Sequence, residues 1–271
     1  MSVETITLGC RLNFAETDTI ARNATADGEW IVVNSCSVTN EAVRQTRQAI
    51  RHAHRRRPSA KILVTGCAAE LDPKAFEAMP EVSRVVGNAD KLDFSAFVLS
   101  EAPQGRSRRA SAPTPFDFAS LRSGRTRSDV KASTVVPAGF PGNIRSFVAV
   151  QTGCDHRCTF CTIWQARGPS RSFSFEAIRD AVAREIDRGA REIVLTGVDI
   201  TDYDGGLGKL CQRLLVSEPR LKRLRLSSLD SIEIDEALFE LIACEPRLLP
   251  HFHLSLQAGD DLILKRMKRR H

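Results

Sequence analysis

The chain has 271 residues and a mass of 29.9 kDa, more than one typical core needs, so we expect about two domains or one large α/β unit. Hydrophobic residues make up 42% of the sequence, which excludes global disorder, and no apolar run reaches the roughly 20 residues that cross a bilayer. The first residues lack the basic and apolar regions of a signal peptide. We therefore expect a cytoplasmic protein with no membrane partner and with reduced cysteines.

The net charge of +6 is unevenly distributed along the chain. Basic residues gather in three clusters, at 44–57, 106–131 and 265–270, and leave the rest of the chain acidic. Such clusters are typical of a surface that binds a polyanion, although arginine-rich helices with solvated faces give the same pattern. Taken together, the three clusters favour a nucleic-acid partner.

In the first hundred residues, short β-branched runs alternate with helical patterns. We predict strands at 3–8, 30–34, 61–66 and 84–87, and helices at 13–27, 41–56 and 73–79. Thr39 or Asn40 can cap the second helix, and Asp72 followed by Pro73 can start the third. This alternation predicts a parallel sheet with helices packed on its faces.

Periodicity disappears in a serine-, arginine- and proline-rich segment and then resumes. We predict further strands at 146–151, 192–197, 223–227 and 251–256, and helices at 175–188, 208–216, 235–244 and from 260 onward. Four such βα units are typical of part of an α/β barrel. The sequence thus predicts a domain at 1–98, a linker at 99–143 and a second domain, a truncated barrel, at 144–271.

Three cysteines follow the carboxyl ends of predicted strands: Cys10, Cys36 and Cys67. Ligands gather at that edge of a parallel sheet. Without further context, such cysteines are more often buried core residues than ligands. Two others, Cys211 and Cys244, lie on apolar faces of predicted helices, and we assign both to the core.

A C-x3-C-x2-C motif follows the first strand of the second half and consists of Cys154, Cys158 and Cys161. Three thiolates on one loop can hold three corners of an iron–sulfur cube and leave the fourth iron without a protein ligand. The alternative is a structural zinc site with His156, but the spacing departs from the usual zinc patterns.

This motif, with Phe160 before its last cysteine, resembles the signature of radical S-adenosylmethionine (SAM) enzymes. The resemblance implies that Cys154, Cys158 and Cys161 hold a 4Fe-4S cluster and that the methionine part of SAM chelates the open iron. Phe160 would then lie near the adenine. One electron from the cluster cleaves SAM to a 5′-deoxyadenosyl radical, chemistry that belongs to the cofactor.

Further segments resemble the methylthiotransferase family within that superfamily, at 9–13, 34–39, 65–68, 167–172, 195–200, 225–228 and 253–260. The resemblance implies a second 4Fe-4S cluster on Cys10, Cys36 and Cys67. It also implies an α/β fold in which an amino-terminal parallel α/β sheet domain precedes a partial (β/α) radical-SAM barrel. The chain departs from the family at Trp164, where a proline is expected, and the remaining barrel strands and the small RNA-binding β-domain have no counterpart.

Within the family, segments 34–39, 195–201 and 265–271 are most similar to the branch that acts on threonylcarbamoyladenosine in tRNA. That branch implies transfer of a methylthio group to the C-2 carbon of this base, next to the anticodon. One SAM molecule donates the methyl group and a second supplies the radical. The implied partners are the tRNA anticodon stem-loop and an electron donor such as a flavodoxin or ferredoxin, and no DNA.

Two kinds of alternative stay open. The first is a methylthiotransferase for another tRNA adenosine or for a ribosomal protein. The second is a non-catalytic, RNA-binding iron–sulfur or zinc protein, which would bind metal and tRNA without cleaving SAM.

We expect the SAM pocket in residues at or just past the predicted barrel strand ends, namely Gly197, Asp199, Ser227 and Gln257. Ordinary turn or cap roles are the alternative for each of them. Arg167 and Arg171 are candidates for contacts with the cofactor or with RNA phosphates, because a guanidinium fork suits phosphate. A surface salt bridge is the alternative for both.

Overall fold

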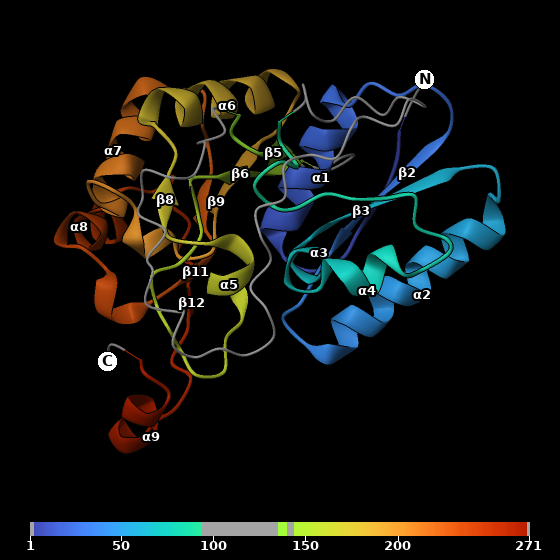
Figure 1. Cartoon of the computed structure of the whole chain (residues 1–271). Helices are drawn as coiled ribbons and strands as arrows, with labels where there is room; N and C mark the ends of the chain where they lie inside the picture. The colour runs from blue at the N-terminus through green and yellow to red at the C-terminus, as the bar shows by residue number, and fades with distance from the viewer. Residues whose placement is uncertain (1–2, 94–134, 140–143, 270–271) are drawn as a thin grey trace.

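The computed structural model describes residues 3–93, 135–139 and 144–269, whose arrangement Figure 1 shows. Most of the predicted linker lies outside the described residues. Two four-stranded sheets lie next to each other, and helix α1 (Arg11–Asn23) lies between them.

The first sheet is parallel throughout and has the order β1-β2-β3-β4. Its strands are β1 (Glu4–Thr7), β2 (Trp30–Ser35), β3 (Lys61–Gly66) and β4 (Arg84–Val85). The helices that follow β2 and β3 are α2 (Asn40–Arg56), α3 (Cys67–Leu71) and α4 (Pro73–Glu77). The predicted caps are confirmed: the Thr39 and Asp72 side chains accept backbone N–H groups at the starts of α2 and α4.

Both faces of the first sheet are covered by apolar layers, because β2 and β3 are buried almost throughout. On one face Ile31 of β2 packs in a cluster with Ile50 of α2 and Phe76 of α4. On the other face Val32 packs in a cluster with Ile20 of α1. These layers fix the strands, so the loops at their carboxyl ends start from defined positions.

The second sheet has the order β10-β9-β6-β5, with three parallel strands and the antiparallel edge strand β5. Its strands are β5 (Ala138–Gly139), β6 (Arg145–Ala149), β9 (Glu192–Thr196) and β10 (Leu224–Leu226). Two small pairs lie beyond it: β7 (Gln151–Thr152) with β8 (Arg171–Ser172), and β11 (Ser228–Leu229) with β12 (His253–Leu254).

Helices connect these strands as in a βα series. They are α5 (Ile163–Arg167), α6 (Phe175–Asp187), α7 (Leu207–Ser217), α8 (Glu236–Cys244) and α9 (Asp261–Arg266), with the 3-10 turns η3 (Ile200–Asp202) and η4 (Ser231–Glu233). The main core joins residues of the second sheet to the inner faces of α6, α7 and α8. Figure 1 shows these three helices on the side of the second sheet that faces away from α1.

Helix α1 connects the two sheets. Ala15 packs in a cluster with Phe147 of β6 and Val194 of β9. The Thr19 hydroxyl accepts a hydrogen bond from the Ala138 backbone N–H in β5 (3.0 Å). Because the same helix also packs on the first sheet, the two sheets share one element and are held at a fixed distance.

The predicted α/β fold and its parallel amino-terminal sheet are confirmed, and the predicted strands and helices are present with shifted ends. Cys211 is buried as predicted, but Cys244 is exposed, so its assignment to the core was wrong. Cys244 is the last residue of α8, whose buried face consists of Leu238 and Leu241, and it lies past the edge of the core. Among the described residues, every helix is too short or too polar to span a membrane.

Candidate metal centres

The first set of thiols lies at the carboxyl edge of the first sheet. Cys10 precedes α1 just after β1, Cys36 directly follows β2, and Cys67 begins α3 directly after β3. Since β1, β2 and β3 are paired in parallel, their ends meet at one edge. The structure thus brings together three cysteines that are far apart in the sequence.

Two local features hold these segments close. Gly66 has a φ of +95°, and a Cβ atom there would overlap the carbonyl oxygen of Ser35, so only glycine lets β3 turn into α3 against β2. The Asn13 amide donates to the Leu8 carbonyl (2.7 Å) and to the Ser35 carbonyl (3.0 Å). Asn13 thereby ties the backbone before Cys10 to the end of β2.

The three sulfur atoms also influence one another. Burial raises the pKa of Cys36, and negative charge on Cys10 and Cys67 raises it further. Bound metal supplies the positive charge that three neighbouring thiolates need. Three cysteines from separate loops, one of them exposed, fit a 4Fe-4S cluster with one iron open to another ligand.

The second set of thiols lies on the Cys154 loop, residues 153–162, between β7 and α5: Cys154, Cys158 and Cys161. The Cys154 N–H donates to the Gly168 carbonyl (3.0 Å) and the Thr159 N–H donates to the Met267 carbonyl (3.1 Å). The Arg157 guanidinium stacks over the ring of Trp164, the residue in place of the expected proline, at 4.3 Å from its centroid. The loop is therefore held at both ends.

Gln151, fully buried in β7, connects the Cys154 loop to the turn after β9. Its Nε2 donates to the Gly153 carbonyl (2.8 Å) and to the Ser170 hydroxyl (2.9 Å). Its Oε1 accepts the N–H groups of Val198 (3.1 Å) and Asp199 (2.9 Å). All four hydrogen-bonding positions of this amide are used, so it orients the loop and the turn relative to each other.

A polar cluster lies beside Cys154. Asp199 Oδ2 is 3.9 Å from Cys154 Sγ and 3.4 Å from His156 Nε2, which in turn lies 3.2 Å from Glu233 Oε1. The Thr201 hydroxyl donates to Asp199 Oδ1 (2.9 Å). Burial and the nearby charge of Glu233 raise the pKa of Asp199.

The donors near Cys154 allow two kinds of metal site. Cys154 with His156 and Asp199, or His156 with Asp230 and Glu233, place their ligand atoms within 4.8 Å of one another, and mixed sulfur, nitrogen and oxygen donors suit zinc. Burial raises the pKa of Cys154 to about 12, and Asp199 and the other two loop thiols contribute to this rise. A thiolate here therefore needs a strongly cationic partner, and three thiols on one loop fit a cluster with an open iron.

Of the residues expected in the cofactor pocket, three lie at the ends of strands and two are exposed outside the sheet. Gly197, Asp199 and Ser227 lie at the carboxyl ends of β9 and β10, and Ser227 is buried. Phe160, on the Cys154 loop, has an exposed fraction of 52%. Gln257 is also exposed, in the segment before α9.

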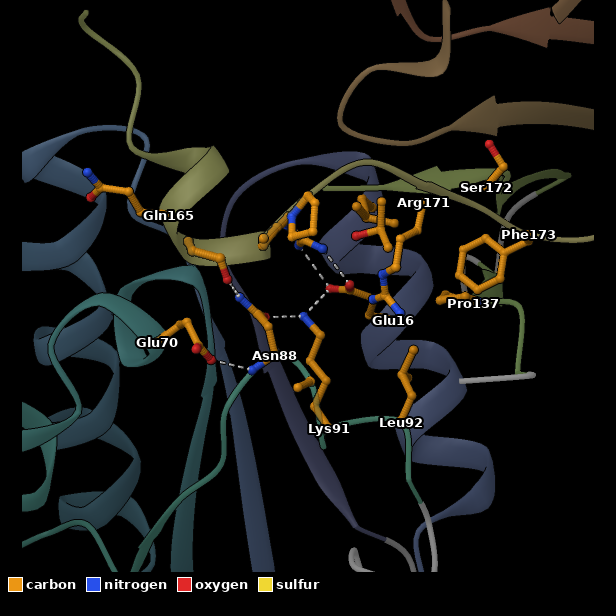
Figure 2. A pocket seen from close by; sticks show the side chains of 17 residues that line it. Glu16, Glu70, Asn88, Lys91, Leu92, Pro137, Gln165, Arg171, Ser172 and Phe173 are labelled. Carbon is orange, nitrogen blue, oxygen red and sulfur yellow. Dashed lines mark hydrogen bonds and ion pairs between the residues drawn. The ribbon is translucent and has the colours of Figure 1, made fainter. Parts of the chain in front are cut away.

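Arg167, a candidate for contact with the cofactor or with RNA phosphates, forms an ion pair inside the protein. Its guanidinium is buried and pairs with Glu16 Oε1 (2.7 Å), because the end of α5 packs against the first domain. Arg171 is half-buried and lines a cavity of about 120 Å³ that also borders Glu16 and Lys91 (Figure 2). Burial lowers the pKa of Arg171.

Sequence reasoning missed several residues that contact these centres. Gln151 gave a signal, since it is a polar residue at the end of a buried strand just before the cysteine motif. Glu16 belongs to the amino-terminal pattern that resembles the family, but the sequence does not show its partners. Asn88 and Lys91 gave no signal, because their partners come from segments distant in sequence.

Two family models match separate stretches of the chain. The model of the Radical SAM superfamily matches residues 148–271. The model of a family described as Uncharacterized protein family UPF0004 matches residues 2–87.

Several curated relatives are similar over nearly the whole chain. Threonylcarbamoyladenosine tRNA methylthiotransferase MtaB of Rickettsia prowazekii is 43% identical over 99% of this chain and 62% of its own length. The MtaB proteins of Aquifex aeolicus and Treponema pallidum are 35% and 30% identical, over 66% and 68% of their lengths. The chain thus spans less than two thirds of the length of the Rickettsia prowazekii and Aquifex aeolicus proteins.

Among solved structures, the radical SAM methyltransferase TsrM from Kitasatospora setae has a similar fold. Its structure with tryptophan and a SAM analogue aligns with a TM-score of 0.55 and 14% identity, over 92% of this chain and 52% of the other. At that identity the likeness shows the fold alone.

Proposed function

The chain belongs to the radical SAM methylthiotransferase family, and on that premise we propose that it transfers a methylthio group to the C-2 carbon of threonylcarbamoyladenosine in tRNA. One observation carries the proposal. Two sets of three cysteines lie at the carboxyl ends of two neighbouring sheets, one of them on a loop with the spacing of the radical SAM motif. Such an arrangement suits an enzyme that needs a radical source and a second cluster in one molecule.

The radical SAM family implies SAM and a 4Fe-4S cluster, and we assign the cluster to Cys154, Cys158 and Cys161. We assign a second 4Fe-4S cluster to Cys10, Cys36 and Cys67. When bound, the first supplies an electron that cleaves SAM and the second holds the sulfur to be transferred. The C-2 hydrogen of an adenine is far too weakly acidic for a side-chain base at neutral pH, which favours radical chemistry.

The chain's own residues orient these groups. Gln151 fixes the Cys154 loop against the turn that carries Asp199. Asp199 presents a carboxylate 3.9 Å from Cys154 Sγ, and a carboxylate there suits the cationic ammonium group of SAM. Gly197 and Ser227 line the ends of neighbouring strands, while Phe160 and Gln257 are exposed to an incoming ligand.

The partners follow from the same proposal. We assign the anticodon stem-loop of tRNA as substrate and a flavodoxin or ferredoxin as electron donor. A cytoplasmic location is part of the same proposal. Basic residues on α2 support an RNA partner, since Arg44, Arg47 and Arg51 line one surface hollow on that helix. A different adenosine or a ribosomal protein as substrate would leave both sets of cysteines in the same roles.

The experiment is a methylthiolation assay on an anticodon stem-loop that contains threonylcarbamoyladenosine. The reconstituted chain, SAM and a reductant are incubated under anaerobic conditions, and the nucleosides are analysed by mass spectrometry. We expect a methylthio product from the unchanged chain, none from Cys36→Ala, and 5′-deoxyadenosine from Cys36→Ala but not from Cys154→Ala. SAM cleavage with no product on any tRNA would contradict the proposed substrate, and binding of tRNA with no SAM cleavage would favour a non-catalytic protein.

A further inference from the structure

A buried ion network lies between the two sets of cysteines. It consists of Arg167, Glu16 and Lys91, with Asn13 and Asn88 as neutral partners. Figure 2 shows Glu16, Asn88 and Lys91 converging at the wall of the cavity. The exposed fractions of the charged side chains are 3%, 4% and 1%. Burying charges costs free energy even when they are paired, so the network is not a simple gain in stability.

Within the network Arg167 and Lys91 are the two basic groups and Glu16 is the acid between them. At its edge the Glu70 carboxylate accepts the Asn88 backbone N–H (2.7 Å). Arg167 binds both oxygens of Glu16, at 2.7 Å and 3.2 Å, and Lys91 Nζ lies 2.6 Å from Glu16 Oε2. Burial would raise the pKa of Glu16, but the charges of Arg167 and Lys91 lower it to about 2. The carboxylate is therefore ionised. Burial lowers the pKa of Lys91, and the charge of Glu16 opposes that shift, so the Lys91 ammonium depends on its contact with Glu16.

The two basic groups reach the first set of cysteines through the two asparagines. Arg167 donates to Asn13 Oδ1 (2.7 Å), which lies 3.8 Å from Cys10 Sγ. Lys91 donates to Asn88 Oδ1 (2.7 Å), and Asn88 Nδ2 lies 3.9 Å from Cys67 Sγ.

The same network is tied to the loop of the other set. Arg167 lies on α5, the helix that follows Cys161, and the Asn88 amide also donates to the Ala166 carbonyl of α5 (2.7 Å). Arg167 therefore lies on the helix next to the Cys154 loop, and Asn88 connects that helix to Lys91.

We propose that the positive charges of Lys91 and Arg167 raise the reduction potential of the cluster on Cys10, Cys36 and Cys67. The inference rests on the proposed function, which assigns a cluster to these thiols. Reduction adds one electron from the electron donor and makes the cluster more negative. A fixed positive charge in a water-poor site stabilises that state, and nearby charge is one of the factors that set cluster potentials.

The test isolates this cluster by changing Cys154, Cys158 and Cys161 to alanine in the full chain. After anaerobic reconstitution, its potential is measured by a redox titration followed by electron paramagnetic resonance. Lys91→Met removes one cation, and Asn88→Asp adds an anion of nearly the same shape. Lys91→Arg keeps the charge and is the matched control.

We expect Lys91→Met and Asn88→Asp both to lower the potential, and Lys91→Arg to leave it within error of the parent. A role in packing alone would not shift the potential in the direction of the charge. Should Lys91→Met lose its iron, Asn88→Asp tests the same change in charge. Unchanged or raised potentials in the variants that hold a cluster would overturn this inference and leave the proposed function standing. If the parent, with only Cys10, Cys36 and Cys67 left as ligands, assembles no cluster, the proposed function is contradicted as well.

Discussion

At the scale of single residues, two glycines decide whether the cysteines can reach their places. Gly66 and Gly153 both have positive φ values, +95° and +79°, which side chains rarely adopt. At each position a Cβ atom would overlap a carbonyl oxygen, of Ser35 at Gly66 and of Pro169 at Gly153. A carbonyl of the main chain cannot move aside as a flexible side chain can.

The two glycines therefore predict selective loss of one cluster. Gly66→Ala should displace Cys67 and remove iron from the first set of cysteines, and Gly153→Ala should displace Cys154 and remove it from the second. Each variant should keep about half of the iron of the unchanged chain, since each cube holds four irons. Iron analysis after reconstitution measures this.

Gly189→Ala is the control for backbone strain, because Gly189 has a φ of +96° but open space around its Cβ position. It should keep the iron of the unchanged chain. Equal loss of iron in all three variants would show that general destabilisation, rather than the local overlap, is the cause.

At the scale of elements, Glu192 ties three strands of the second sheet together. It lies in β9 and pairs with Arg145 of β6 (2.7 Å) and Arg225 of β10 (2.8 Å), with Arg223 also in contact. Burial would raise the pKa of Glu192, but the hydrogen bond from Arg225 and the charge of Arg145 outweigh it and lower the pKa from 4.5.

A lowered pKa means that the folded state favours the ionised carboxylate. The stabilisation from Glu192 is therefore complete above the ordinary value of 4.5 and is lost as the pH falls below it. We expect Glu192→Gln to be less stable than the unchanged chain at neutral pH, with a difference that shrinks as the pH falls through that range. Urea unfolding at a series of pH values, with metal-free protein, measures this, and a difference that is independent of pH would contradict it.

Most of the elements could be predicted from the sequence, because their signals are local. The strands β2 and β3 are continuous apolar runs, and caps such as Thr39 and Asp72 are read within one turn. The short helices α3 and α5 could not be predicted, since five residues give no periodic pattern and neither helix has the capping signal that Asp72 and Pro73 give α4. Cys244 was misplaced because an apolar helical face does not reveal where the core ends.

The two sets of cysteines differ in how far the sequence alone predicts them. The spacing of Cys154, Cys158 and Cys161 is a local pattern, whereas the convergence of Cys10, Cys36 and Cys67 follows from strand pairing and family resemblance. The partner of Arg167 is Glu16, 151 residues away in sequence, so no local pattern shows that this arginine is buried in an ion pair. Contacts between domains have no sequence signal of this kind.

At the scale of the whole molecule, part of the basic cluster at 44–57 lies on the surface, as binding of a polyanion partner requires. Arg44 and Arg51 are exposed on α2, the helix that follows Cys36, and both line its surface hollow. In the last basic cluster, Arg269 is instead used inside the protein, in an ion pair with Asp230 (2.7 Å). The basic cluster at 106–131 lies outside the described residues.

Changing both Arg44 and Arg51 to alanine should weaken tRNA binding and make it less dependent on salt. Each lost phosphate contact lowers the slope of log affinity against log salt by about 1. Binding titrations at several salt concentrations measure this. The matched control changes Arg179, half-buried, and Arg184, exposed, on α6 to alanine. Equal losses in both variants would contradict a specific surface on α2.

The most direct test of the two-centre account is the content of iron, sulfide and zinc per chain after anaerobic reconstitution. The account predicts about eight irons and about eight sulfides per chain, because each set of three cysteines holds one 4Fe-4S cube. It also predicts that Cys36→Ala and Cys154→Ala each halve both values. Stoichiometric zinc without iron, held near Cys154 by His156 and Asp199, would contradict the account.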